Sequence, residues 1–243
     1  GRMGAGIAQV FAERGVTVTI ADSLDQEGAR SRVATGLQRA ADRGQLGGRA
    51  PDEVLTRVHT VGEPRALPTD LGLVVEAVPE NVSLKLDVLA QVAETVAATT
   101  VIASNTSSLS ISELGAAPVS YTHLTLPTRA GLGAALPDPS RFVGMHFFNP
   151  VPVSELVEIV RAGTTAQSTV DAVRGWVDAL GKTAIVVNDS PGFATSRLGV
   201  HLGLEAIRMV EEGVADAEHE HRRHGPPDRG VRGHHERQRQ QPD

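Results

Sequence analysis

Hydrophobic residues recur along the chain in two alternating patterns, one with the period of a strand and one with the period of a helix. Apolar or β-branched runs predict strands near residues 16–20, 57–61, 71–78, 100–103, 142–148, 155–160 and 183–187. Apolar positions three and four residues apart predict a helix from about residue 7, and others over 29–43, 84–96, 111–116, 166–180 and 193–212. This alternation predicts an α/β fold with a doubly wound, mostly parallel sheet, whose ligands bind at the carboxyl ends of the strands.

The first residues have the spacing of a glycine-rich phosphate loop. Residues 1–4, with Gly1, Met3 and Gly4, match the end of a G-x-G-x-x-G pattern, in which backbone amides approach a pyrophosphate and the last glycine lets helix and strand pack closely. Asp22 follows Gly4 by 18 residues, near the spacing expected for a carboxylate on a ribose 2'-hydroxyl, and it would repel a 2'-phosphate. The pattern predicts a Rossmann-type NAD site whose first glycine and first strand are missing from the chain. A plain helix-start turn is the alternative.

Composition and charge narrow the class of function. The 243 residues are 40% hydrophobic and 21% charged, which is typical of a globular protein of one or two domains. The absence of cysteine excludes thiolate metal ligands and cysteine nucleophiles. A net charge of −6 argues against a nucleic-acid partner. No apolar run approaches the roughly 20 residues of a membrane helix, and no signal peptide is visible, so we expect no membrane partner and a cytoplasmic location.

Two segments do not fit the alternation of helices and strands. Residues 118–130 lie between a predicted helix and a predicted strand that a short loop could join, and we expect them to be foreign to the native gene. Residues 219–243 hold five of the nine histidines and predict a disordered, out-of-frame tail. Metal capture by these histidines is the weaker alternative, and no metal site is predicted.

Four motifs carry the remaining chemistry: LVVEAVPE from Leu73, SNTSSL from Ser104, GMHFFNPVPV from Gly144 with ELVEIV directly after it, and DSPGF from Asp189. With these motifs, residues 1–218 apart from 118–130 resemble the 3-hydroxyacyl-CoA dehydrogenase family, most closely its bacterial 3-hydroxybutyryl-CoA branch. SNTSSL and HFFNPVP are specific to that family. The resemblance implies NAD-dependent oxidation of a (3S)-3-hydroxyacyl-CoA substrate to 3-oxoacyl-CoA, in fatty acid β-oxidation or butanoate-type metabolism.

The resemblance implies catalytic roles for four residues. His146 matches the base that takes the 3-hydroxyl proton, which suits a side chain with an ordinary pKa of about 6.5, and Glu158 matches its partner carboxylate. The two are 12 residues apart, enough for a strand–loop–strand return. Ser107 matches the serine that bonds the substrate oxygen, and Asn149 matches the asparagine beside the nicotinamide. The alternatives are structural: a buried histidine, an edge-strand glutamate, and helix-capping Ser or Asn residues.

Four further positions follow from the same resemblance. Glu80 and Lys85 match positions that line the cofactor site. Arg43 falls near a basic position that meets the CoA phosphates, although a solvated helix face explains it equally well. Ser196 stands where the family usually has asparagine, so we expect weaker polar support for the substrate there.

The implied organisation has an NAD-binding domain over residues 1–187 and the start of an all-helical C-terminal domain over 188–218. In the family this second domain closes over the acyl chain and forms the homodimer. Most of it is expected to be absent here, which leaves the apolar face of its first helix uncovered.

Two other functions stay open. Truncation at both ends favours a non-catalytic NAD-binding fragment of such an enzyme. A related hydroxyacid dehydrogenase would need a lysine base, and only Lys85 and Lys182 are available.

Overall fold

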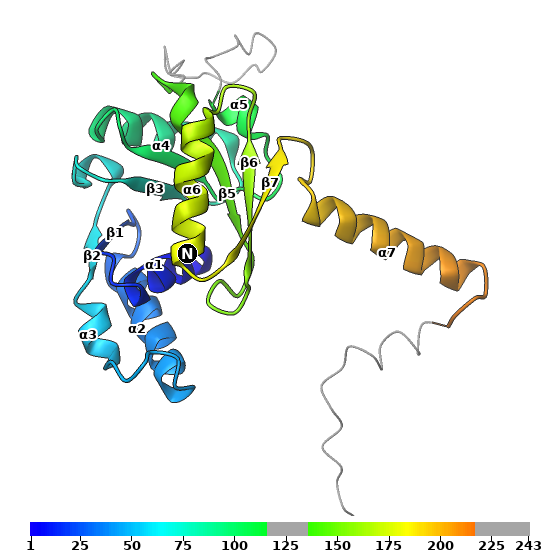
Figure 1. Cartoon of the computed structure of the whole chain (residues 1–243), viewed down its shortest axis with the longest axis horizontal. Helices are drawn as coiled ribbons and strands as arrows, with labels where there is room; N and C mark the ends of the chain where they lie inside the picture. The colour runs from blue at the N-terminus through cyan, green and yellow to red at the C-terminus, as the bar shows by residue number, and fades with distance from the viewer. Residues whose placement is uncertain (116–135, 217–243) are drawn as a thin grey trace, which may run out of the picture. The chain divides into compact units, whose positions relative to one another are not determined.

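The computed structural model describes residues 1–115 and 136–216 (Figure 1). The contacts divide the chain into two units, Gly1–Arg197 and Leu198–Asp243. Residues 118–130 and 219–243, for which the sequence predicts a foreign insertion and a disordered tail, lie outside the described residues.

The described strands all belong to the first unit and form two sheets. The strands are β1 (Val18–Ala21), β2 (Val58–Val61), β3 (Leu73–Glu76), β4 (Val101–Ser104), β5 (Phe142–Phe147), β6 (Leu156–Arg161) and β7 (Thr183–Asn188). β1 and β2 form a parallel pair, and the other five lie side by side in the order β3-β4-β5-β6-β7, parallel except for the antiparallel pair β5 and β6. The mostly parallel α/β fold is therefore confirmed. No ladder joins β1 to β3 in the part of the chain that the structure describes.

The helices follow the predicted alternation. They are α1 (Arg2–Glu13), α2 (Gln26–Asp42), α3 (Pro51–Leu55), α4 (Val82–Thr95), α5 (Ile111–Gly115), α6 (Gln167–Ala179) and α7 (Thr195–Glu211), with short 3-10 turns over Pro64–Ala66 and Pro139–Arg141. Side chains set two of the starts, because Asp25 accepts a hydrogen bond from the amide of Gly28 and Asn81 accepts one from Leu84. α3 and the 3-10 turns were not predicted, since elements of five or three residues are too short to show a helical period.

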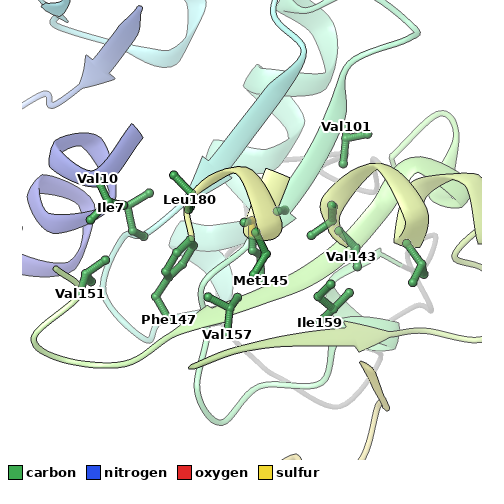
Figure 2. Close-up of a cluster of buried hydrophobic side chains, with 14 residues drawn as sticks. Ile7, Val10, Val101, Val143, Met145, Phe147, Val151, Val157, Ile159 and Leu180 are labelled. Atoms are coloured by element: carbon green, nitrogen blue, oxygen red, sulfur yellow. The ribbon is translucent and has the colours of Figure 1, made fainter. Parts of the chain in front are cut away.

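Helices cover both faces of the five-stranded sheet. α1 and α6 pack on one face, in the buried cluster shown in Figure 2, and α4 and α5 pack on the other. Because side chains alternate along a strand, Met145 and Phe147 of β5 join the first cluster, whereas Phe142 joins the second. The same alternation assigns His146 of β5 and Glu158 of β6 to the second face.

α7 begins at the boundary between the two units and has no buried residue. Its large apolar side chains are exposed; they include Leu198, Val200, Leu202, Leu204 and Ile207. None of the described helices has the length and apolarity needed to cross a bilayer.

Candidate active site

His146 and Glu158 form a buried pair on adjacent strands. They are register partners across the antiparallel pair of β5 and β6, and 2.7 Å separates His146 Nδ1 from Glu158 Oε2. Their side chains are 7% and 0% exposed. The predicted strand–loop–strand return is therefore observed. The alternative of an edge-strand glutamate is wrong, because β6 pairs with β5 on one side and with β7 on the other.

The Glu158 carboxylate accepts four hydrogen bonds. Oε1 accepts the amides of Ala194 (3.1 Å) and Thr195 (2.9 Å), and Oε2 accepts the Thr195 hydroxyl (2.8 Å) in addition to His146 Nδ1. Burial works to raise the pKa of Glu158, but the hydrogen bonds from His146, Thr195 and Ala194 outweigh it and hold the pKa below its ordinary value. The carboxylate is consequently an anion at neutral pH.

Ala194 and Thr195 were not among the predicted site residues. They stand at the start of α7, where backbone amides lack intrahelical acceptors and a carboxylate is a preferred partner. The sequence signal for this contact was the predicted helix start near residue 193. Its partner on another strand could not be found without the fold.

The imidazole of His146 has one nitrogen left for chemistry. Since an anionic carboxylate accepts from Nδ1–H, the neutral ring carries its lone pair on Nε2. The rings of Phe148 and Phe193 lie with their centroids 4.5 and 5.6 Å from that of the imidazole and restrict its rotation. The arrangement is that of a general base whose acidic partner is fixed.

Glu80 organises the loop that carries Ser107. Its carboxylate accepts the Ser107 amide at 2.7 Å, the Thr106 hydroxyl at 2.8 Å and the Ser107 hydroxyl at 3.2 Å. Partial burial works to raise the pKa of Glu80, but these hydrogen bonds and the ammonium of Lys85 lower it. Ser107 itself is exposed just beyond the carboxyl end of β4. Glu80 is thus placed to support Ser107.

Lys85 is buried next to Glu80. Its side chain is 1% exposed, and its ammonium donates to Glu76 (2.9 and 3.0 Å) and to the Val78 carbonyl (3.1 Å), with Glu80 at 3.3 Å. Protein oxygens surround the ammonium in this structure, and the prediction that Lys85 lines the cofactor site stays a prediction. Lys85 joins α4 to the end of β3 and neutralises the two carboxylates.

Asn105 ties together the ends of three neighbouring strands, and the sequence analysis did not select it. Its side-chain oxygen accepts the amide of Phe147 on β5 at 2.9 Å, and its own amide donates to the carbonyl of Glu76 on β3 at 2.8 Å. Asn105 directly follows β4. These bonds hold the Ser107 loop next to the strand that carries His146, at the carboxyl ends of the parallel strands.

The glycine-rich start of α1 and Asp22 lie together at the carboxyl end of β1. The first helical hydrogen bond runs from the Ala5 amide to the Gly1 carbonyl, so the amides of residues 2–4, including Met3 and Gly4, have no intrahelical acceptor. Asp22 Oδ2 lies 3.8 Å from the Gly1 nitrogen. Free amides at a positive helix end and a nearby carboxylate fit the pyrophosphate and ribose of a dinucleotide.

The Asp22 carboxylate is fixed by the turn that follows it. Oδ1 accepts the amides of Leu24 (3.1 Å) and Asp25 (3.0 Å). Burial works to raise the pKa of Asp22, but these amides and the Arg32 guanidinium lower it. The side chain is therefore an anion, which supports the predicted discrimination against a 2'-phosphate.

The sequence motif predicts that Gly4 is the position where the helix packs closely on its neighbour, but the structure shows this at Gly6. A Cβ at Gly4 would lie 3.8 Å from Ala77, an ordinary contact, whereas a Cβ at Gly6 would lie 2.9 Å from the Cβ of Val151. Gly6 is therefore the position at which α1 approaches its neighbour too closely for a side chain.

A profile described as the NAD binding domain of 3-hydroxyacyl-CoA dehydrogenase matches residues 1–124 and 125–190. The chain belongs to the 3-hydroxyacyl-CoA dehydrogenase family. This confirms the resemblance seen in the motifs.

Relatives of known name agree with the family. A probable 3-hydroxybutyryl-CoA dehydrogenase from Deinococcus radiodurans is 36% identical over 220 residues, which cover 90% of this chain and 72% of that protein. The mitochondrial hydroxyacyl-coenzyme A dehydrogenase of Homo sapiens is 35% identical over 225 residues, covering 90% of this chain and 66% of that protein. The crystal structure of (S)-3-hydroxybutyryl-CoA dehydrogenase from Ralstonia eutropha superposes with a TM-score of 0.77 at 35% identity, covering 90% of this chain and 71% of the other.

Three further positions expected from the 3-hydroxyacyl-CoA dehydrogenase family, all within the described residues, make no hydrogen bond to His146 or Glu158. Asn149 is exposed just beyond β5, and Ser196 is half-buried in the first turn of α7. Arg43 is exposed at the end of α2, which packs on α1, α3 and the sheet of β1 and β2. The structure does not bring Arg43 to His146, and its assignment to the CoA phosphates stays a prediction.

Neither lysine is placed to act as a base. Lys182 Nζ donates to the carbonyls of Val151 (2.8 Å) and Ser154 (2.6 Å), and burial lowers its pKa. Lys85 is enclosed by oxygens. Within residues 1–115 and 136–216, no group of three or more histidine and carboxylate side chains could hold a metal ion. The geometry therefore favours His146 as the base.

Proposed function

We propose that this chain catalyses the NAD-dependent oxidation of (3S)-3-hydroxyacyl-CoA to 3-oxoacyl-CoA. The observation that carries the proposal is the buried His146–Glu158 pair beside the carboxyl ends of the parallel strands, in a chain of the 3-hydroxyacyl-CoA dehydrogenase family. When bound, NAD supplies the hydride acceptor.

His146 performs the proton transfer. Nε2 accepts the proton of the 3-hydroxyl group as hydride leaves C3, and Nδ1–H remains bonded to Glu158. The anionic carboxylate stabilises the imidazolium that forms, and burial strengthens this attraction. A positioned general base of this kind accelerates a reaction by about 10²- to 10⁴-fold.

Ser107 stabilises the substrate oxygen. Its hydroxyl is only loosely held by Glu80, at 3.2 Å, whereas its backbone amide is held at 2.7 Å. The hydroxyl can therefore turn to the substrate while the residue itself stays in place. A donor at the oxygen where negative charge develops favours the transition state.

The start of α1 and Asp22 hold the cofactor. The amides of residues 2–4 bind the pyrophosphate, and Asp22 accepts the ribose hydroxyls. Glu80 supports the nicotinamide end through the Ser107 loop, with Asn149 next to it in our proposal.

The proposal is tested by adding acetoacetyl-CoA and NADH to the purified chain and following NADH absorbance. We expect acetoacetyl-CoA-dependent loss of NADH and much weaker activity with NADPH. If calorimetry shows that NAD binds but no turnover occurs, the chain is a non-catalytic NAD-binding fragment, and the proposal is wrong.

Organisation and location stay predictions. The boundary between residues 1–187 and 188–218, the homodimer and the cytoplasmic location rest on the resemblance and the sequence pattern. The human relative is named as mitochondrial, so members of the family differ in location.

A further inference from the structure

The hydroxyl of Thr195 and the imidazole of His146 bind the same carboxylate oxygen. Glu158 Oε2 accepts Thr195 Oγ1 at 2.8 Å and His146 Nδ1 at 2.7 Å. The other oxygen, Oε1, is held by the amides of Ala194 and Thr195. Two of the three residues that hold the carboxylate therefore come from one short segment.

The same segment also touches the imidazole. Phe193 is buried, its ring meets that of His146 edge-on, and its backbone has a φ of 48°, in the left-handed region that non-glycine residues rarely adopt. Gly192, just before it, has a φ of 75°. Such a backbone persists only where the surrounding structure holds it, and it is concentrated at functional sites. Residues 193–195 thus contact both members of the His146–Glu158 pair.

We propose that Thr195 is a positioning residue that sets how much of the negative charge on Glu158 reaches the imidazole. The proposal rests on the proposed role of His146 as the base. The two amides that bond Oε1 fix the plane of the carboxylate. The Thr195 hydroxyl stabilises negative charge on Oε2, which weakens the hydrogen bond between Oε2 and the imidazole. Hydrogen bonds to a charged acceptor are strong enough for the Thr195 hydroxyl to change the protonation equilibrium of the imidazole measurably.

Among the described residues, the other side chains next to the pair are uncharged. His146 is flanked by the rings of Phe148 and Phe193, and on the β7 side Glu158 is the register partner of the apolar Ile185. The state of the imidazole therefore depends on Glu158 and on the donors to it.

The test compares Thr195→Val, which removes the hydroxyl but keeps the shape, with Thr195→Ser, which restores the hydroxyl. We expect the Nδ1 proton of His146 to move downfield in the NMR spectrum of Thr195→Val, because Oε2 then has a single donor. The acid limb of kcat/KM for hydroxyacyl-CoA oxidation should move to higher pH by about 0.5 to 1 unit, with the plateau within about threefold of wild type. Thr195→Ser should return both readouts towards wild type.

Thr169→Val is the matched control. Its hydroxyl also makes a single hydrogen bond, to the Ser140 carbonyl at 2.9 Å, in a buried position on α6. This variant should lose stability without moving either readout. An unchanged Nδ1 signal in Thr195→Val, or a failure of Thr195→Ser to restore it, would overturn the inference. The NMR arm needs no turnover, so an inactive wild type with the expected Nδ1 shifts would reject the proposed function and keep the role of Thr195.

Discussion

Two buried, hydrogen-bonded side-chain pairs lie near the carboxyl ends of β3 and β5, and the difference between them distinguishes a reactive pair from a supporting one. Lys85 and Glu76 are enclosed completely, because the ammonium meets the Glu76 carboxylate, the Val78 carbonyl and Glu80. His146 and Glu158 are also buried, and both oxygens of Glu158 accept hydrogen bonds, but Nε2 of His146 is left to accept a proton. Burial and a hydrogen bond to a carboxylate are common to both pairs. Only the His146–Glu158 pair has an atom, Nε2, that can take part in a proton transfer.

The largest expected effect comes from removing that nitrogen. His146→Ala should lower kcat/KM by about 10²- to 10⁴-fold, because the side chain that accepts the proton is gone, while NAD binding changes little. Steady-state kinetics with calorimetry checks both. His59→Gln, at an exposed histidine on β2, is the control and should behave as wild type. Equal losses of turnover and NAD affinity would show that His146 is structural.

Breaking the enclosed pair should instead damage the fold. Lys85→Met leaves Glu76 buried without its cation, and we expect the free energy of unfolding to fall by about 3 to 5 kcal/mol, measured by urea denaturation. Arg65→Met is the control, because Arg65 and Glu94 form an exposed pair, each side chain being 56% exposed, worth at most about 1 kcal/mol. Similar small losses in both variants would contradict the supporting role of Lys85.

The sequence predicted the elements well because their patterns are local. The apolar run before Glu76 and the alternation along β5 each identify a strand from a few residues. The motifs likewise selected His146, Glu158 and Ser107. The spacing of 12 residues allowed the return that joins His146 to Glu158, although it did not show which atoms meet.

What the sequence missed are contacts between distant segments. Thr195 reaches Glu158 across 37 positions, and Asn105 reaches Phe147 across 42, so no local pattern records either bond. The enclosure of Lys85 was missed for the same reason, because motif matching assigns a position but not the direction of a side chain.

A smaller effect is expected within the support of the substrate. Ser107→Ala should lower kcat/KM by about tenfold, the cost of one donor at the developing negative charge, and should leave the free energy of unfolding nearly unchanged. Ser108→Ala is the control, because its hydroxyl makes only a long contact of 3.4 Å with Glu80. Equal effects in the two variants would remove the special role of Ser107.

The smallest effect concerns pH and stability. The pKa of Glu158 is lower in the folded chain than in the unfolded one, so the carboxylate contributes stability that is present above its ordinary pKa of about 4.3 and is lost as the pH falls through the folded value. Thermal denaturation between neutral and acidic pH should show a shallower loss in Glu158→Gln than in wild type. Parallel curves would mean that Glu158 does not contribute to acid sensitivity.

The most direct test of the account is a double-mutant cycle on kcat/KM with His146→Ala, Glu158→Gln and the double variant. If Glu158 acts only through the imidazole, the double variant should be no slower than His146→Ala, within about threefold. Losses that multiply in the double variant would show that the two residues act independently, and would contradict the account of a single base and its fixed partner.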